Sequence, residues 1–243
     1  LEPEDHRNVA GFVAADYGLV SDDPGWIDVN RGDLEFYESE VAAGNYASYS
    51  PFPLFGPPAL NDPDGDSPYI PGLTNLMAGI GIATWPAYDG FSYHFLAGTF
   101  DEYGMPTGLV YTDPDNWVDF MVYAPPWEPY QFMIDYLMAI CSPETSPWDD
   151  QLGDITVPLL WLAAAGGAAP PTDYLLDVIG SEDITELVVG YEAPEDAWLD
   201  FAHIDLFIAD NAEAEVWSPT LNWIVKHTSH RNERGGANVA SGF

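Results

Sequence analysis

The stretch Ile155-Thr156-Val157-Pro158-Leu159-Leu160-Trp161-Leu162-Ala163 decides the fold class of this chain. It is apolar along most of its length and lacks the alternation of polar and apolar residues that marks a strand with one wet face. Such a run predicts a strand buried on both faces, as in a parallel sheet. The apolar run at residues 9–15 and the segment 184–189 predict two more strands. With helices between them, these strands indicate an α/β fold.

A long insertion separates the first two of these strands. Residues 21–150 are crowded with proline, glycine and aromatic residues, which favours short helices alternating with turns. One helix is expected behind the possible cap Asp33, and another is expected to open at Pro129. The expected organisation is therefore core at 1–20, a mostly helical cap at 21–150, core again at 151–227, and a disordered tail at 228–243.

The charge balance excludes several classes of partner. The 243 residues include 40 acidic side chains but 5 lysines and arginines, for a net charge of −35. Such a surface argues against binding nucleic acid or anionic lipid. It is typical of salty or extracellular surroundings, so we expect an extracellular or periplasmic protein, with a high-salt cytoplasm as the alternative. No apolar run approaches the roughly 18 residues of a membrane span, and none is expected.

A histidine-bearing stretch follows the third predicted strand. Asp200-Phe201-Ala202-His203-Ile204-Asp205-Leu206-Phe207 precedes a closing helix on which Trp217, Leu221 and Ile224 share one face. This order of strands, histidine loop and helix resembles the C-terminal half of the α/β-hydrolase family. The resemblance covers 1–20 and 151–227, and it makes 21–150 the cap between the sixth and seventh strands. Family members usually have glycine before the histidine, whereas this chain has the slightly larger Ala202.

The resemblance implies roles for two side chains. His203 would be the general base that takes the proton of a nucleophile and returns it to the leaving group. Most family members place the acid that orients this histidine after the strand corresponding to 155–163, but residues 164–169 contain no carboxylate. A minority place it one strand earlier, which here is Asp16. Asp16 is therefore the expected partner of His203, and Asp173 is the alternative.

The nucleophile of such an enzyme has no counterpart in this sequence. It requires Gly-x-Ser-x-Gly at a strand-to-helix turn, because small neighbours permit the strained geometry. The nearest string, Gly90-Phe91-Ser92-Tyr93-His94, lacks the last glycine and follows no expected strand. In the family, five strands and the nucleophile precede the segment that here begins near Val9. We therefore expect a companion polypeptide, or a missing N-terminal segment, that supplies the serine and covers the open sheet edge.

The expected cap is rich in aromatic side chains, most of which should form its core. By the resemblance, some would line an apolar cleft over His203, as in the lids of esterases and lipases. The side chains expected to contact a small apolar ester or acyl substrate are Tyr17, Trp85, Phe91 and Trp127. The chain is thus expected to act as a serine-type hydrolase on a carboxylic ester or related acyl compound once it is assembled with the segment that carries the nucleophile.

Two alternatives to catalysis stay open. The chain can be a non-catalytic binding or assembly subunit on a hydrolase-derived scaffold. It can also be an acidic calcium-binding protein, because Asp62, Asp64 and Asp66 gather hard oxygen ligands around a glycine turn. That loop lacks the spacing and the terminal glutamate of an EF-hand. The histidines show no zinc-binding spacing, and Cys141 is the one cysteine, so Ca²⁺ is the one cofactor that the sequence suggests.

Overall fold

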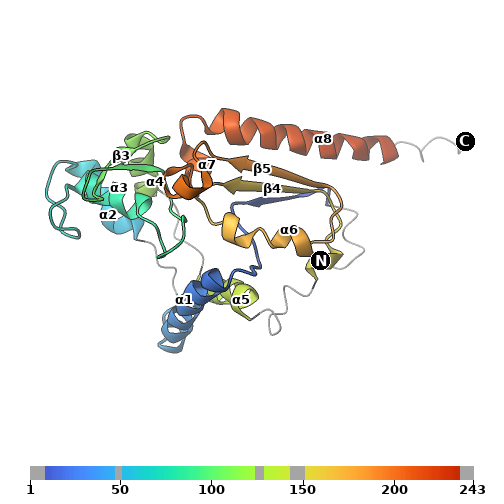
Figure 1. The fold of residues 1–243 in the computed structure, drawn as a ribbon, viewed down its shortest axis with the longest axis horizontal. Helices are drawn as coiled ribbons and strands as arrows, with labels where there is room; N and C mark the ends of the chain where they lie inside the picture. The colour runs from blue at the N-terminus through green and yellow to red at the C-terminus, as the bar shows by residue number, and fades with distance from the viewer. Residues whose placement is uncertain (1–8, 47–50, 124–128, 143–150, 236–243) are drawn as a thin grey trace, which may run out of the picture.

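A computed structural model describes residues 9–46, 51–123, 129–142 and 151–235 of the chain. Its centre is a 3-stranded parallel sheet in the order β1-β4-β5 (Figure 1). The strands are β1 (Phe12–Ala15), β4 (Leu159–Ala164) and β5 (Ile184–Val189). The predicted α/β class is confirmed at this level. β5 coincides with its predicted range, whereas β1 and β4 begin a few residues later than expected.

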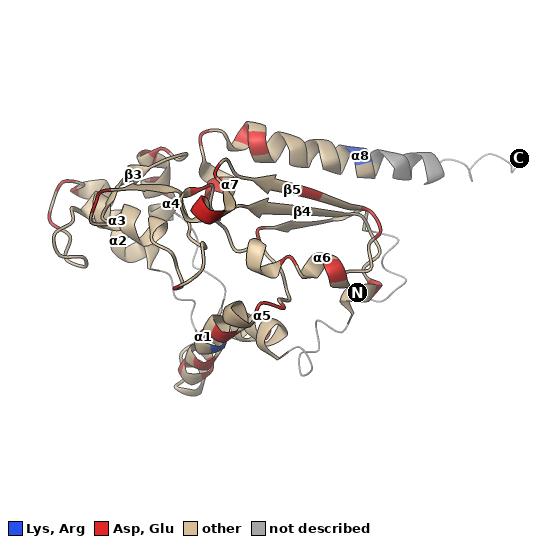
Figure 2. Cartoon of the chain, in the orientation of Figure 1, with Lys and Arg blue, Asp and Glu red and all other residues tan. Residues whose placement is uncertain are grey.

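The central strand β4 is buried on both faces, as its apolar sequence predicted. Leu159, Trp161 and Ala163 pack into one apolar cluster, which includes Leu175 of the short helix α6 (Leu175–Val178). The alternate residues Leu162 and Ala164 belong to a second cluster on the opposite face, around Phe201, Leu206 and Val216. Because successive side chains of a strand point to opposite faces, one six-residue strand anchors both clusters. Acidic residues are spread over helices and loops, but β1 and β4 carry none (Figure 2).

The closing helix α8 (Ser218–Gly235) follows the short helix α7 (Asp205–Ile208) and the π-helical turn η6 (Glu213–Trp217), and it runs alongside the sheet (Figure 1). Trp223 attaches it, because its indole N–H donates to Thr185 Oγ1 at 3.1 Å. The face shared by Trp217, Leu221 and Ile224 is instead exposed, by 52%, 60% and 40%. The helix also extends to Gly235, into the range expected to be a disordered tail; residues 236–243 lie outside the described part.

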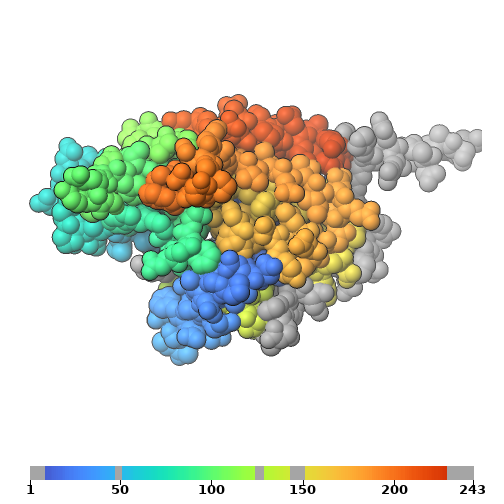
Figure 3. Space-filling view, in the orientation of Figure 1, coloured from blue at the N-terminus to red at the C-terminus, as the bar shows by residue number. Residues whose placement is uncertain are grey.

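We call residues 21–150, which separate β1 from β4, the insertion. Its described residues form two groups of helices. Helices α2 (Phe52–Asn61), α3 (Asn75–Thr84) and α4 (Pro114–Tyr123) gather at one end of the molecule with the hairpin β2 (Gly98–Phe100) and β3 (Pro106–Leu109) (Figure 3). Helices α1 (Pro24–Ala42) and α5 (Tyr130–Cys141) pack on each other elsewhere (Figure 1). The hairpin is an element that the sequence reasoning did not anticipate.

One local expectation for the insertion was wrong, and one helix was not located. Helix α1 begins at Pro24 rather than behind Asp33, because the Asp23 carboxylate caps it by accepting from the N–H groups of Gly25 and Trp26. The proline-rich stretch at 51–58 lies largely within helix α2, which the sequence reasoning did not locate. Burial of Phe52 outweighs the cost of the prolines inside this helix, because packing stabilises it more than intrinsic propensity does.

Candidate active site

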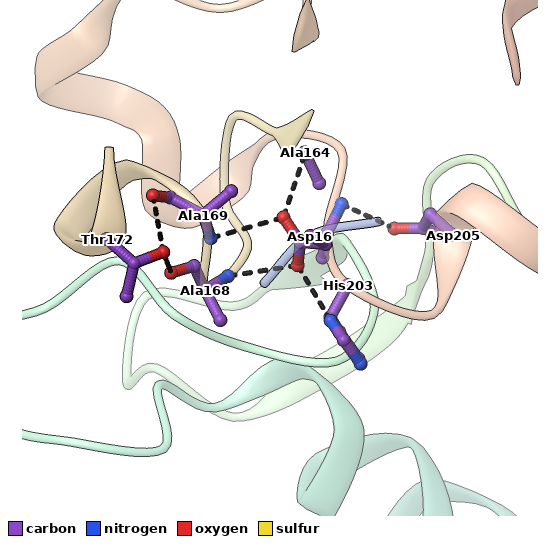
Figure 4. A network of polar contacts seen from close by, with 8 residues as sticks. Asp16, Ala164, Ala168, Ala169, Thr172, His203 and Asp205 are labelled. Atoms are coloured by element: carbon purple, nitrogen blue, oxygen red, sulfur yellow. Dashed lines mark hydrogen bonds and ion pairs between the residues drawn. The ribbon is translucent and has the colours of Figure 1, made fainter. Parts of the chain in front are cut away.

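The expected aspartate and histidine meet at the carboxyl end of the sheet. Asp16 directly follows β1, and His203 lies in the loop before α7. The distance from His203 Nδ1 to Asp16 Oδ2 is 2.7 Å (Figure 4). The Asp16 side chain is fully buried, whereas that of His203 is 26% exposed. The alternative acid, Asp173, lies at the end of the 3₁₀ turn η4 (Pro170–Thr172).

The small-residue loop after β4 forms a cradle for the Asp16 carboxylate. The backbone N–H groups of Ala164, Ala168 and Ala169 donate to its oxygens at 2.9, 3.0 and 3.3 Å (Figure 4). These donors replace the water that a buried carboxylate loses. A Cβ on Gly167 would lie 2.1 Å from Asp16 Oδ2, so only glycine fits there. The loop therefore carries no acid of its own because it is shaped around one from the neighbouring strand.

The backbone of Asp16 contributes to this geometry. Its φ of 49° is the one positive value at a non-glycine position among the described residues. Aspartate adopts this left-handed conformation more readily than most residues, although at some cost. On the far side of the cradle, Thr172 Oγ1 donates to the carbonyls of Ala168 and Ala169. Strain of this kind at a buried charge is what a site under functional constraint commonly shows.

Two further buried carboxylates hold the histidine loop. Asp205 accepts from the N–H groups of Ala97 and Ala202 and from Thr112 Oγ1, at 2.8, 3.0 and 2.7 Å. Asp200 accepts from the N–H groups of Tyr191, Glu192 and Phe201. Burial raises the pKa of Asp205 to about 6, although its hydrogen bonds act in the opposite direction and lower the pKa. Sequence reasoning missed both roles, although acidic residues on either side of an apolar histidine loop were a visible signal.

His203 has a second ring nitrogen, Nε2. Among the residues that the structure describes, no serine, threonine or cysteine side chain donates a hydrogen bond to it. The rings beside His203 are those of Tyr93 and Phe207, with centroids 6.0 and 6.3 Å away. Burial, followed by the charge of Asp16, raises the pKa of Tyr93 well above its ordinary value, so its hydroxyl keeps its proton. The arrangement can therefore orient one imidazole and leave its Nε2 free to accept a proton.

The structure describes three of the four residues expected to contact substrate, and each of the three contacts another part of the chain. Tyr17 stacks on Tyr136 with ring centroids 4.3 Å apart. Phe91 packs against Trp26 and lines a surface hollow of about 620 Å³ whose wall does not include His203. The Trp85 indole N–H donates to Gly104 O in the loop of the hairpin. Trp127 lies outside the described residues. Contact of these four with a substrate stays a prediction.

The acidic turn suggested for calcium is organised by its own backbone. Gly65 N donates to Asp62 O, which also accepts from Asn75 Nδ2. Over the described ranges, no group of three or more histidine, cysteine or acidic side chains is arranged to hold a metal ion, and this includes Asp62, Asp64 and Asp66. Calcium binding there stays a prediction. Within the same ranges, no helix is both long enough and apolar enough to cross a membrane.

Comparison of the chain with models of protein families, with curated proteins and with solved structures gives no match. Its function must therefore be inferred from its residues and their geometry.

Proposed function

We propose that this chain carries the histidine–aspartate part of a serine-type hydrolase active site, built on part of an α/β-hydrolase fold, and that its substrate is a carboxylic ester or related acyl compound. The observation that carries the proposal is the 2.7 Å contact between a fully buried Asp16 and a partly exposed His203 at the carboxyl ends of parallel strands. A carboxylate on Nδ1 holds the proton there, which leaves the lone pair on Nε2.

The chemistry that this pair can supply is proton transfer. Nε2 takes the proton of a serine hydroxyl while that oxygen attacks the acyl carbon, and the buried Asp16 carboxylate stabilises the resulting imidazolium. The imidazolium then protonates the leaving alcohol, and a water molecule repeats the cycle to release the acid. The serine and the donors that stabilise the oxyanion would come from a companion polypeptide or a further segment.

The open edge of the sheet supports such a companion. Within the described residues, β1 pairs with β4 alone. Phe12 N and Asp16 N donate to Pro158 O and Leu162 O of the β4 side. Backbone groups alternate along a strand, so those of Val13 and Ala15 face away from β4 and can pair with another strand.

The test is to purify the protein from its source and measure the intact masses of its components. We expect a second polypeptide that contains Gly-x-Ser-x-Gly, whose serine reacts with a fluorophosphonate. In the assembled protein, His203→Ala should lower ester hydrolysis by at least about 10⁴-fold while the protein still folds and assembles. Full turnover by that variant would remove the assigned base.

A second candidate function is a non-catalytic assembly subunit. The exposed Trp217 at the end of η6 and the exposed Leu221 on α8 favour it, because large apolar side chains in one row on a surface often mark contacts with other proteins. A preparation that contains this chain with a partner but is inert to the fluorophosphonate would support this candidate over the hydrolase.

A further inference from the structure

His94 is a fully buried histidine that the proposed chemistry does not use. Its ring lies between two backbone carbonyls, with Nδ1 2.6 Å from Ser92 O and Nε2 3.1 Å from Asp200 O. Carbonyl oxygens can only accept, so each contact is favourable only when the ring nitrogen carries a proton. His94 is therefore placed to donate hydrogen bonds rather than to act as a base. One of its two acceptors belongs to the loop that carries His203.

The backbone of His94 joins the same three segments. Its N–H donates to Gly166 O at 3.1 Å, and its carbonyl accepts from His203 N at 3.3 Å. Gly166 in turn donates to Phe201 O at 2.8 Å. A Cβ on Gly166 would lie 2.4 Å from the His94 ring, so the cradle loop passes directly against the imidazole. The insertion, the cradle of Asp16 and the His203 loop thus meet at this residue.

We infer that His94 is a positioning residue: by holding the Asp200 carbonyl and the backbone N–H of His203, it fixes the His203 ring against Asp16. Asp200 is three residues before His203, and a rotation of the loop at that point would carry the ring away from its partner. The catalytic meaning of this role rests on the proposed function. The geometric effect does not, because it can be measured without turnover.

The two hydrogen bonds of the His94 ring can be tested separately by substitution, because the ring is neutral at neutral pH. Burial lowers the pKa of His94, and this effect outweighs the two carbonyls and the nearby carboxylates of Asp16 and Asp200, which favour the charged ring. At neutral pH the ring therefore carries one proton, so it donates to one carbonyl at a time. The tautomer with its proton on Nε2 is the one that holds the Asp200 carbonyl, and the inference rests on that tautomer. Asparagine places an amide nitrogen near the position of Nδ1, facing Ser92 O, and glutamine places one near Nε2, facing Asp200 O.

The test measures the proton on His203 Nδ1 by NMR in the 243-residue chain. We expect a downfield signal in the unmodified chain that is retained in His94→Gln, weakened in His94→Asn and lost in His94→Phe. The matched control is His227→Phe, which removes another imidazole that contacts a backbone carbonyl, that of Trp223 on α8. This control should leave the His203 signal unchanged.

Three outcomes would overturn the inference. The first is an unchanged His203 signal in a folded His94→Phe variant. The second is equal loss in the glutamine and asparagine variants, which would assign His94 a packing role alone. The third is failure of all three variants to fold, which would make His94 a core residue. If the inference holds while the fluorophosphonate test fails, His94 still orients His203, and the hydrolase proposal alone is lost.

Discussion

The cradle around Asp16 and the α2–α3–α4 cluster of the insertion are both buried, but they are built in opposite ways. The cradle uses alanine and glycine, so that backbone N–H groups can approach a carboxylate closely. The cluster uses large rings such as Phe52 and Trp117, whose centroids are 5.2 Å apart. The structure of the cradle therefore depends on the directions of its hydrogen bonds, whereas that of the cluster depends on the volumes of its side chains. Substitutions in the first region should therefore disturb the geometry around His203, and substitutions in the second should cost more stability but leave that geometry in place.

The largest effect is expected from Asp16→Asn. Asparagine tolerates the left-handed backbone but places an amide NH₂ where Asp16 accepts from His203 or from the cradle. The wrong His203 tautomer should lower turnover of the assembled protein by about 10⁴-fold. If the amide NH₂ faces the N–H groups of the cradle, two donors meet without an acceptor, and the free energy of unfolding should fall by roughly 1–3 kcal/mol. Ester hydrolysis and urea denaturation measure the two effects, and activity within tenfold of the original would contradict the role of Asp16.

In the cluster, Trp117→Ala should lower the free energy of unfolding by about 3–5 kcal/mol, because a fully buried indole leaves a cavity. The indole N–H also donates to Gly79 O, and this hydrogen bond would be lost. The His203 Nδ1 proton signal should nevertheless persist while the protein is folded. Tyr103→Ala, at a side chain that is 81% exposed, is the control and should change stability little. A loss of the His203 signal in folded Trp117→Ala would break the distinction between the regions.

Gly167→Ala tests how closely the backbone of the cradle packs against the Asp16 carboxylate. The new Cβ would lie 2.1 Å from Asp16 Oδ2, so the loop must shift, at a cost of about 1–3 kcal/mol and with loss of the His203 signal. The matched control is Gly32→Ala in α1, where a Cβ meets nothing within 4 Å. That change should raise stability by up to about 1 kcal/mol, because alanine favours helix. Equal results for the two variants, from thermal unfolding, would show that the cradle is not closely packed.

The smallest effect concerns the pH dependence of stability. The pKa of Asp205 is raised from 3.8 to about 6 in the folded chain, so the folded state binds this proton more tightly than the unfolded state. The stability that this group contributes is present below its unfolded pKa and is lost as the pH rises from about 4 to about 6.

Asp205→Asn should remove that part of the slope. The amide oxygen can accept from Ala97 N and Ala202 N, and its nitrogen can donate to Thr112 Oγ1, so the contacts survive without a buried charge. The measurement is the difference between the two proteins in the free energy of unfolding across this pH range. A constant difference from pH 4 to pH 7 would contradict the raised pKa.

Local sequence patterns predicted the strands, because those signals lie within a few neighbouring residues, whereas the pairing of Asp16 with His203 was expected from the resemblance to the α/β-hydrolase family. The apolar run at 155–163 contains most of β4, and the histidine loop follows β5 as expected. Helix α2 and the start of α1 were missed. In α2, contacts of Phe52 with distant residues stabilise a helix that its prolines disfavour, and such contacts are invisible in a local pattern.

The sequence by itself determined the parallel strands, the extreme acidity and the presence of a histidine loop, since each depends on composition or periodicity. The tertiary structure decided between Asp16 and Asp173 as the carboxylate that faces His203, because Asp16 is 187 residues away from it in the chain. It also decided why the loop after β4 is free of acids and why His94 is buried between two carbonyls. Both follow from close approach between segments, which depends on three-dimensional packing and hydrogen-bond direction.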